Sequence, residues 1–192
     1  MPRIPIAVRP MTAEGDRDRD RDRDRDALEI RLARPTDARA FLAFWKSIVA
    51  EERFVRTEEV RTSVRAYRRR FRGRSDLETD IVAVEGGRLV GHVTVQRERH
   101  PVTHHVASLS IAVAADARGR GIGRRLMDEA IAWSTRAGIE KLVLSVYPHN
   151  DAAIALYRSV GFVEEGRLAR HSRKSYGYED EILMAAWIGG DG

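Results

Sequence analysis

The segment at residues 109–126 constrains the fold most strongly, because it changes from strand-like to helix-like across a glycine-rich turn. Residues 109–113 are mostly apolar and suit a strand, whereas residues 121–137 place apolar side chains at helical spacing. The turn between them holds Gly119, Gly121 and Gly123. Glycine lets backbone N–H groups approach a ligand closely, and N–H groups at a helix N-terminus attract anions. The segment therefore predicts a phosphate-binding loop.

The charges around this turn support the same prediction. Four arginines flank the glycines, namely Arg118, Arg120, Arg124 and Arg125. The helix dipole is positive at this end, so each cation costs about 0.3–1 kcal/mol unless an anion compensates it. A Walker A loop would need Lys followed by Ser or Thr, and a dinucleotide loop would need a further glycine where Arg124 or Leu126 stands. The alternative is a solvated arginine cluster beside a turn that simply requires glycine.

The remaining pattern predicts a mixed α/β sheet with helices on its faces. Alternating or apolar runs predict strands at residues 28–32, 81–84, 89–95, 105–113, 141–146, 162–163 and 178–187. Helical spacing predicts helices around residues 41–48, 57–71, 121–137 and 151–160. These elements place one folded domain at residues 27–188.

Residues 1–26 have a different character. A strict Asp-Arg alternation fills residues 16–26, with six Asp, five Arg and no apolar residue. A segment without apolar side chains has no burial free energy to offset the conformational entropy that it would lose on ordering. We therefore expect a disordered or weakly helical N-terminal extension, with a binding role as the alternative.

Composition excludes several classes of protein. The 192 residues contain no cysteine, which rules out disulfides, thiolate zinc sites and cysteine nucleophiles. No stretch approaches the ~20 apolar residues of a membrane span, and the N-terminus lacks a secretory signal, so we expect a cytoplasmic protein without a membrane partner. The net charge of +5 suggests a polyanionic partner, which can be a nucleotide cofactor, a nucleic acid or an acidic protein.

The pattern Arg-x-x-Gly-x-Gly, after a strand and opening a helix, resembles the acyl-CoA signature of the GNAT superfamily of N-acetyltransferases. The resemblance covers about residues 28–187. It implies an α/β (α+β) domain, with a twisted, mostly antiparallel sheet of six or seven strands and about four helices. It also implies acetyl-CoA as cofactor. The pantetheine arm of acetyl-CoA would pair with the backbone of Ile111, Ala112 and Val113. The pyrophosphate of acetyl-CoA would bind the amides of Arg118, Gly119, Arg120, Gly121, Ile122, Gly123 and Arg124.

A second segment, residues 147–162, resembles the C-terminal half-site of the same family. It has an Asn, a helix rich in small residues, a Tyr and a Gly-Phe pair. Asn150 can cap the helix and reach the cofactor, and Ala153 is one of the small residues that let a cofactor arm pack closely. The resemblance makes Tyr157 the general acid, because a phenol with a pKa of about 10 can protonate a leaving thiolate. The alternative is a core aromatic at helical spacing.

The sequence offers several candidates for the general base but does not single one out. Many relatives carry a carboxylate on the strand before the loop, but residues 106–111 contain neither Asp nor Glu. Glu51 and Glu52 follow the first helix and are candidates for attracting an ammonium group. His104 and His105 are further candidates. All four can equally be solvated side chains, and no set of metal ligands is evident.

The C-terminal segment suggests an acceptor class. Gly177, Tyr178, Asp180 and Met184 match a pattern of the branch that acetylates free amino acids and the N-termini of ribosomal proteins. Tyr178 and Asp180 are therefore candidates for the acceptor pocket, with a half-buried hairpin strand as the alternative. The leading interpretation is transfer of acetyl to a primary amine of a small molecule, such as an amino acid. A protein N-terminal acetyltransferase and a non-catalytic acyl-CoA-binding module are the alternatives.

An arginine-rich stretch at residues 61–74 is consistent with a solvated helix face. It is also consistent with contact to an acidic protein or to ribosomal RNA through phosphates. No aromatic ladder accompanies the arginines, so readout of single-stranded nucleic acid is unsupported. The solvated face is the leading interpretation, and a nucleic-acid partner is not expected. The sequence leaves a homodimer open.

Overall fold

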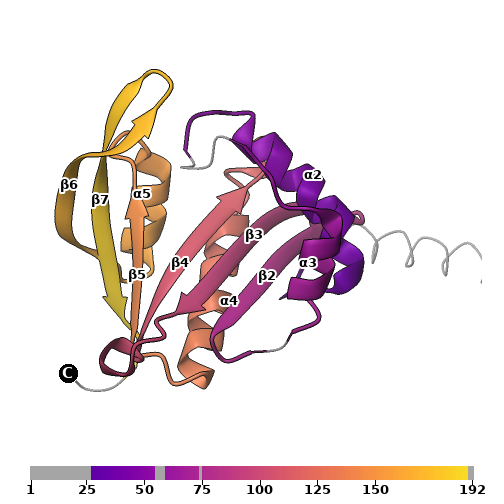
Figure 1. Cartoon of the computed structure of the whole chain (residues 1–192), viewed down its shortest axis with the longest axis horizontal. Helices are drawn as coiled ribbons and strands as arrows, with labels where there is room; N and C mark the ends of the chain where they lie inside the picture. The colour runs from indigo at the N-terminus through magenta and orange to yellow at the C-terminus, as the bar shows by residue number, and fades with distance from the viewer. Residues whose placement is uncertain (1–26, 55–58, 74, 190–192) are drawn as a thin grey trace, which may run out of the picture.

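The computed structural model describes residues 27–54, 59–73 and 75–189 (Figure 1). Seven strands form one sheet in the order β1-β2-β3-β4-β5-β7-β6. Their bounds are β1 Glu29–Leu32, β2 Glu78–Glu85, β3 Arg88–Arg97, β4 Val106–Val113, β5 Lys141–Val146, β6 Val163–Lys174 and β7 Gly177–Trp187. Every neighbouring pair is antiparallel except β4 and β5, which are parallel. The predicted mixed, mostly antiparallel sheet is confirmed.

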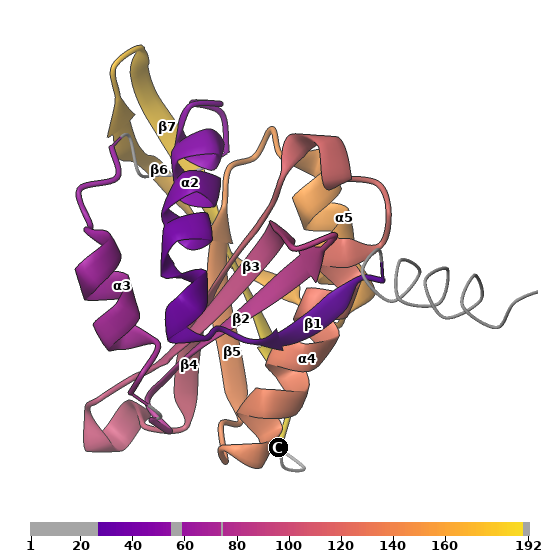
Figure 2. The same cartoon turned by 90° about the vertical axis from the view of Figure 1, so that its right-hand side faces the viewer.

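Four α-helices cover the two faces of this sheet (Figure 2). Helices α2 (Ala38–Val49) and α3 (Val64–Arg70) lie on one face, and α4 (Ile122–Arg136) and α5 (Asp151–Ser159) lie on the other. Short 3-10 turns occupy Pro35–Asp37, Pro101–Thr103 and Ala115–Ala117. The predicted extension at residues 1–26 lies outside the described residues.

Two elements differ most from the sequence prediction. The helix expected from residue 57 begins only at Val64, because the hydroxyl of Ser63 accepts the Ala66 N–H at 3.2 Å and caps it. The strand expected at residues 162–163 is the twelve-residue β6. β6 lies at the sheet edge and is mostly exposed, so its polar sequence carries no apolar alternation that would reveal a strand.

The core lies mainly between α4 and the sheet. Val93 and Val95 of β3 are fully buried, as is Leu126 of α4. At Gly91 a Cβ would lie only 2.9 Å from Leu126 Cδ1, so glycine lets α4 approach the centre of the sheet. This close packing fixes the position of the glycine turn that precedes α4.

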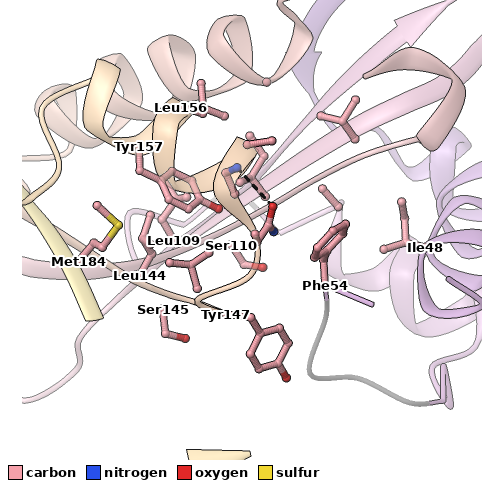
Figure 3. A pocket seen from close by; sticks show the side chains of 18 of the residues that line it. Ile48, Phe54, Leu109, Ser110, Leu144, Ser145, Tyr147, Leu156, Tyr157 and Met184 are labelled. Atoms are coloured by element: carbon pink, nitrogen blue, oxygen red, sulfur yellow. Dashed lines mark hydrogen bonds between the residues drawn. The ribbon is translucent and has the colours of Figure 1, made fainter. Parts of the chain in front are cut away.

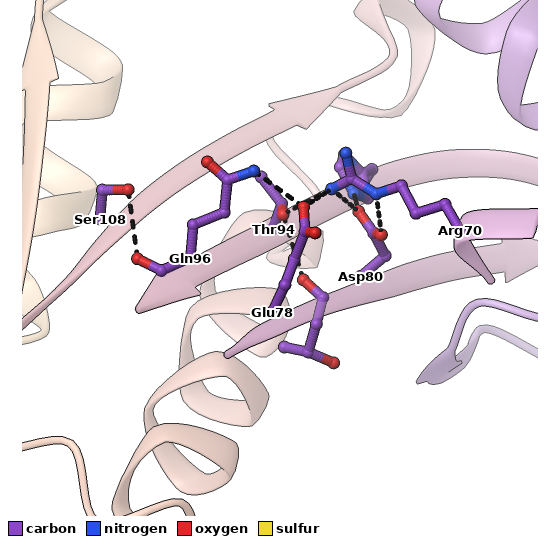
Figure 4. A network of polar contacts seen from close by, with 8 residues as sticks. Arg70, Glu78, Asp80, Thr94, Gln96 and Ser108 are labelled. Atoms are coloured by element: carbon purple, nitrogen blue, oxygen red, sulfur yellow. Dashed lines mark hydrogen bonds and ion pairs between the residues drawn. The ribbon is translucent and has the colours of Figure 1, made fainter. Parts of the chain in front are cut away.

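A polar network covers the opposite face, between α3 and strands β2 and β3 (Figure 4). Arg70 contacts Asp80 (Nε–Oδ2 2.5 Å) and Glu78 (Nη2–Oε1 2.6 Å), and it donates to Thr94 Oγ1 at 3.1 Å. Asp80 Oδ1 also lies 2.8 Å from Nε2 of His92, which is 2% exposed. The network ties α3 to the strand positions that point to the same side as α2.

The sheet splits between β4 and β5. The two strands pair only through Val106 with Lys141, Ala107 with Leu142, and Ser108 with Val143. Beyond these positions β4 continues to Val113 against β3, and β5 continues to Val146 against β7. The strands therefore diverge, and the edge of β4 that faces the split keeps backbone groups unpaired by β5.

Candidate active site

A cavity of about 1130 Å³ occupies the split (Figure 3). Its lining includes Leu156 and Tyr157 from α5 on one face of the sheet. It also includes Ile48 and Phe54, from α2 and the segment after it, on the other face. The cavity therefore reaches both faces, so two ligands that enter from opposite sides can meet at the split.

The strand wall of the cavity comes from β4. Ile111, Ala112 and Val113, which are the predicted cofactor-binding residues of this strand, all line it. They pair with β3, and their other strand edge faces the split. An extended ligand with amide groups matches such an edge, because strand backbone alternates donors and acceptors. The pantetheine arm of acetyl-CoA has this chemistry and so fits the site.

The glycine turn adopts the conformation that its residues permit. Gly119 and Gly121 have φ of +74° and +77°, which side chains rarely adopt, and a Cβ at either would meet no heavy atom within 4 Å. Arg125 N–H makes the first backbone bond of α4, to Gly121 O at 3.2 Å. The N–H groups of Ile122, Gly123 and Arg124 therefore have no acceptor within the helix. The turn thus combines uncrowded glycines with N–H groups that lack a helical acceptor, as a phosphate site requires.

Three of the four flanking arginines pair with carboxylates, so a bound anion is not required to compensate their charges. Arg118 pairs with Glu51 at 2.7 Å, Arg120 with Glu85 at 2.5 Å, and Arg124 with Asp128 at 2.8 Å. The fourth, Arg125, donates to Leu28 O at 3.3 Å. Carboxylates thirty or more residues away in sequence compensate Arg118 and Arg120, so local sequence could not reveal these pairs. The side chain of Arg120 lies outside the cavity lining, whereas Arg118 and Arg124 belong to it.

Helix α5 contributes the second predicted half-site. The side chain of Asn150 caps the helix by accepting the Ala153 N–H at 3.3 Å, and both residues line the cavity. The Tyr157 side chain is buried, and its hydroxyl points into the cavity (Figure 3). Burial raises the pKa of Tyr157 to about 12, so the phenol stays protonated at neutral pH. Its hydroxyl has no hydrogen-bond partner among the described residues, which leaves it available to a ligand.

The predicted acceptor residues are not all brought together. Glu51 lines the cavity, but Glu52 does not. Tyr178 is 52% exposed beneath the guanidinium groups of Arg170 and Arg173, and it lies outside the lining together with Asp180. The Asp180 carboxylate accepts the backbone N–H of Arg170 at 2.8 Å. These two side chains therefore organise the β6–β7 hairpin rather than the wall of this cavity.

The two histidine candidates also lie elsewhere. His104 Nδ1 contacts Glu98 O at 3.1 Å, and the ring of His105 stacks on Trp187 with centroids 6.2 Å apart. Neither belongs to the cavity lining. Both lie where β4 begins, away from the split between β4 and β5.

Sequence reasoning assigned no site role to several wall residues, among them Phe54, Tyr147, His149 and Glu181. The His149 ring stacks on Phe54 and on Tyr147, with centroids 5.7 Å apart in each pair. Glu181 is 1% exposed. Glu181 follows Glu179 and Asp180 in sequence, so no pattern set it apart. Tyr147 and His149 lie in the predicted half-site segment, but no sequence signal linked them to Phe54.

Residues 27–54, 59–73 and 75–189 contain no cluster of three or more His, Asp or Glu side chains that could hold a metal ion. In the same part of the chain, no helix has the length and hydropathy of a membrane span.

A sheet that splits between two parallel strands, with a glycine turn and a deep cavity at the split, defines a GNAT-like fold. The family model of the Acetyltransferase (GNAT) family matches residues 42–162. The chain therefore belongs to this family.

Comparisons with individual proteins agree. The chain is 31% identical over 106 residues to the L-amino acid N-acetyltransferase AaaT of Escherichia coli, covering 55% of this chain and 65% of that protein. It is 41% identical over 97 residues to the N-alpha-acetyltransferase RimI of Mycobacterium tuberculosis, covering 50% and 58%. The chain thus spans about 58–65% of these relatives' lengths. A GNAT-family acetyltransferase from Streptococcus pneumoniae superposes with a TM-score of 0.81 at 28% identity, covering 85% of this chain and 100% of that structure.

Proposed function

We propose that this protein transfers an acetyl group from acetyl-CoA to a primary amine of a small molecule, such as an amino acid, by direct attack in a ternary complex. The observation that carries the proposal is the cavity that passes through the split, with the glycine turn and Tyr157 on one face. We call the face with α4 and α5 the donor side and the face with α2 and α3 the acceptor side.

The donor side supplies mainly backbone groups. The split-facing edge of β4 at Ile111, Ala112 and Val113 supports pairing with an extended pantetheine arm. The amides of the turn support binding of the pyrophosphate, from Arg118, Gly119, Arg120, Gly121, Ile122, Gly123 and Arg124. Asn150 and Ala153 would line the same path. When bound, acetyl-CoA supplies the thioester that an amine can attack.

Tyr157 is the proposed general acid. Its buried hydroxyl keeps its proton at neutral pH, because its pKa is raised to about 12. It can therefore donate a hydrogen bond or a proton to a thiolate that leaves at the split. The low-polarity surroundings that raise the pKa also strengthen that hydrogen bond.

The acceptor class follows from the relatives rather than from the site. The name of the Escherichia coli relative supports an amino acid as acceptor, and the name of the Mycobacterium tuberculosis relative supports a protein N-terminus as the second candidate. Glu51 remains a candidate for attracting the amine, since it lines the cavity. Glu52, Tyr178 and Asp180 are weaker candidates, since they lie outside its lining.

Thiol release from acetyl-CoA tests these candidates directly. The acceptors are L-alanine, spermidine and a peptide that begins with alanine, each at matched concentration. We expect turnover of L-alanine above the peptide. Preferential turnover of the peptide would establish the N-terminal alternative. Tight binding of acetyl-CoA without turnover of any amine would instead identify a non-catalytic acyl-CoA-binding module.

The proposal also covers the domain bounds, the location and the assembly of the protein. We propose that the transferase domain comprises residues 27–188, which include all seven strands and the residues matched by the family model. We propose a cytoplasmic location, where acyl-CoA donors are available to it. A homodimer is a further assembly that sedimentation of the purified protein would test.

A further inference from the structure

We propose that the side-chain carbonyl of Gln96 accepts a hydrogen bond from the acceptor amine, and that Glu78 holds the Gln96 amide in the orientation that this contact requires. The inference rests on the proposed function, because it names the group that binds the acceptor of that reaction. The glycine turn, the α5 half-site and the C-terminal sequence pattern assign a role to neither residue. The ligand class that this inference defines is a primary amine bound through one of its N–H groups.

The first support is the orientation of the Gln96 amide. Its Nε2 donates a hydrogen bond to Glu78 Oε1 at 2.8 Å. A carboxylate accepts hydrogen bonds but donates none, so the NH2 group of Gln96 must face Glu78 and the carbonyl oxygen must face away from it (Figure 4). In the part of the chain that the structure describes, no donor contacts this oxygen. Gln96 lines the cavity and Glu78 does not, so the amide offers a hydrogen-bond acceptor to a ligand there.

The second support is the network that holds Glu78 in place. Arg70 of α3 lies 2.6 Å from Glu78 Oε1 through Nη2, and 2.5 Å from Asp80 Oδ2 through Nε. Asp80 is 8% exposed and also contacts the buried His92. An amide that is oriented in advance loses less conformational freedom when it binds a ligand. The network therefore preorganises the carbonyl of Gln96 for binding.

The third support is the strand register, which places Gln96 on the acceptor side at the start of the split. Gln96 pairs with Ser108, which is the last residue of β4 to pair with β5. Val113 of β4 points to the donor side, because a Cβ at Gly123 of α4 would lie 3.9 Å from its Cγ2. Ser108 lies five residues before Val113 and so points to the acceptor side, since successive residues of a strand alternate between faces. Cross-strand partners share a face, so Gln96 also points to the acceptor side.

The fourth support is chemical, because a neutral carbonyl suits a nucleophilic amine. Only the unprotonated amine has a lone pair with which to attack a thioester. A carboxylate in place of Gln96 would favour the ammonium form, since an opposite charge stabilises the charged state of a titrating group. A neutral carbonyl binds an N–H group and favours the ammonium form less. Gln96 and Tyr157 line the cavity from opposite faces of the sheet, as an amine-orienting group and a general acid for the leaving thiolate would.

Equilibrium binding tests this inference without requiring turnover. The probes are a peptide that begins with alanine and its counterpart that begins with a propionyl group, so that hydrogen replaces the amine. Each is titrated calorimetrically into the full-length protein saturated with CoA. We expect the wild type to bind the alanine peptide about tenfold more tightly than the propionyl peptide. Equal affinities, or binding of neither probe, would overturn the assignment.

The variant Gln96→Met keeps the length of the side chain but removes the amide. We expect the preference for the alanine peptide to fall about fivefold, as for loss of one hydrogen bond, while the affinities for the propionyl peptide and for CoA stay those of the wild type. Ser110→Ala is the matched control, since Ser110 also lines the cavity and lies two residues from Ser108 on the same face of β4. The control should keep the preference. A preference that survives in Gln96→Met, or that falls equally in Ser110→Ala, refutes the proposal.

A second variant tests the positioning role of Glu78 and keeps the test decisive if Gln96→Met does not fold. Glu78→Gln introduces an amide that can donate as well as accept, so it no longer holds the Gln96 amide in one orientation. We expect the preference to fall about twofold, through weaker binding of the alanine peptide alone. A merely structural role would weaken both peptides equally, and that result, or an unchanged preference, would overturn the proposal.

Glu98→Gln is the control for Glu78→Gln. Glu98 is exposed just beyond the end of β3 and lies outside the cavity lining, so its variant should keep the preference of the wild type. An equal loss in Glu98→Gln would show that the charge of this strand end, and not the orientation of Gln96, explains the effect. Absence of thiol release with a preference that depends on Gln96 would reject the proposed transferase activity while leaving the binding assignment in place.

Discussion

The donor side and the acceptor side of the cavity are built from different parts of the chain. The donor side uses the backbone of β4 and of the adjoining glycine turn, and most of its residues fall between Ile111 and Arg124. The acceptor side uses side chains that are more than a hundred residues apart in sequence, such as Phe54 and Glu181. Almost every residue offers the same backbone groups, so ligand binding on the donor side depends mainly on backbone conformation. The acceptor side depends on which side chains are present, so it is the side that can set specificity.

The largest effect should follow from changing the conformation and charge of the donor side. Gly121→Glu places a carboxylate where we expect pyrophosphate, and like-charge contact should raise the Kd for CoA by about 100-fold or more. The control is Gly87→Glu, in the β2–β3 turn, because Gly87 also has a positive φ (+75°) and open space around its Cβ position. Calorimetric titration should show loss of CoA binding only in Gly121→Glu. Equal losses would mean that backbone strain, not phosphate placement, explains the effect.

The next largest effect should separate chemistry from binding on the donor side. Tyr157→Phe removes the proposed acid, and kcat should fall by about 100-fold. The Kd for CoA should stay within about twofold of the wild type, since the ring remains in place. Tyr67→Phe is the control, because Tyr67 packs against Phe41 with centroids 4.8 Å apart, outside the cavity lining. An unchanged kcat in Tyr157→Phe would exclude the acid role.

A smaller effect should distinguish the arginines of the turn. Arg118 lines the cavity, whereas the side chain of Arg120 pairs with Glu85 outside it. Arg118→Ala should therefore weaken CoA binding by about tenfold, as expected for loss of one charge-assisted contact. Arg120→Ala keeps the backbone amide and should weaken it by less than about twofold. The reverse order would show that the turn rearranges when CoA binds.

The smallest effect should appear in stability, through the network beneath the acceptor side. Burial lowers the pKa of His92 below its usual value of 6.5, although its hydrogen bond to Asp80 opposes this. Nδ1 of His92 has no hydrogen-bond partner among the described residues, which fits a neutral ring whose Nε2–H donates to Asp80. Burial opposes ionisation of Asp80, but hydrogen bonds from His92 and Arg70 outweigh it and hold the pKa of that carboxyl below its usual value.

The sign of the pH dependence follows from these directions. Below pH 6.5 the unfolded chain takes up a proton that folded His92 resists, so stability is lost as the pH falls and is complete above pH 6.5. Asp80 adds a further loss in more acidic solution, since its folded pKa lies below its unfolded value. Calorimetry between pH 7.5 and 5 should show Tm falling by about 2–4 °C per kcal/mol lost. His92→Gln should flatten the dependence of Tm on pH. His171→Gln, on the exposed edge of β6, should leave it unchanged. Identical dependences in the two variants would show that His92 does not cause the loss of stability.

The fold could be predicted from sequence wherever a local pattern carries the signal. The alternation of β5 and the helical spacing of α4 gave bounds within one residue of those observed. Most of β6 beyond Val163 was missed because an exposed edge strand needs no apolar alternation. The start of α3 was misplaced because the Ser63 cap outweighed the helical propensity of the preceding residues.

The two sides of the cavity also differ in how far their residues could be predicted from sequence. The sequence by itself determined the glycine turn and the cap at Asn150, because each depends on neighbours within one loop or one turn of helix, whereas the candidate acid Tyr157 came from the resemblance to the family. Only the tertiary structure decided the partners of Arg118 and Arg120, the aromatic stack and the burial of Glu181. The physical reason is that strand register and loop packing bring these side chains together across large separations in sequence. No local periodicity encodes such contacts.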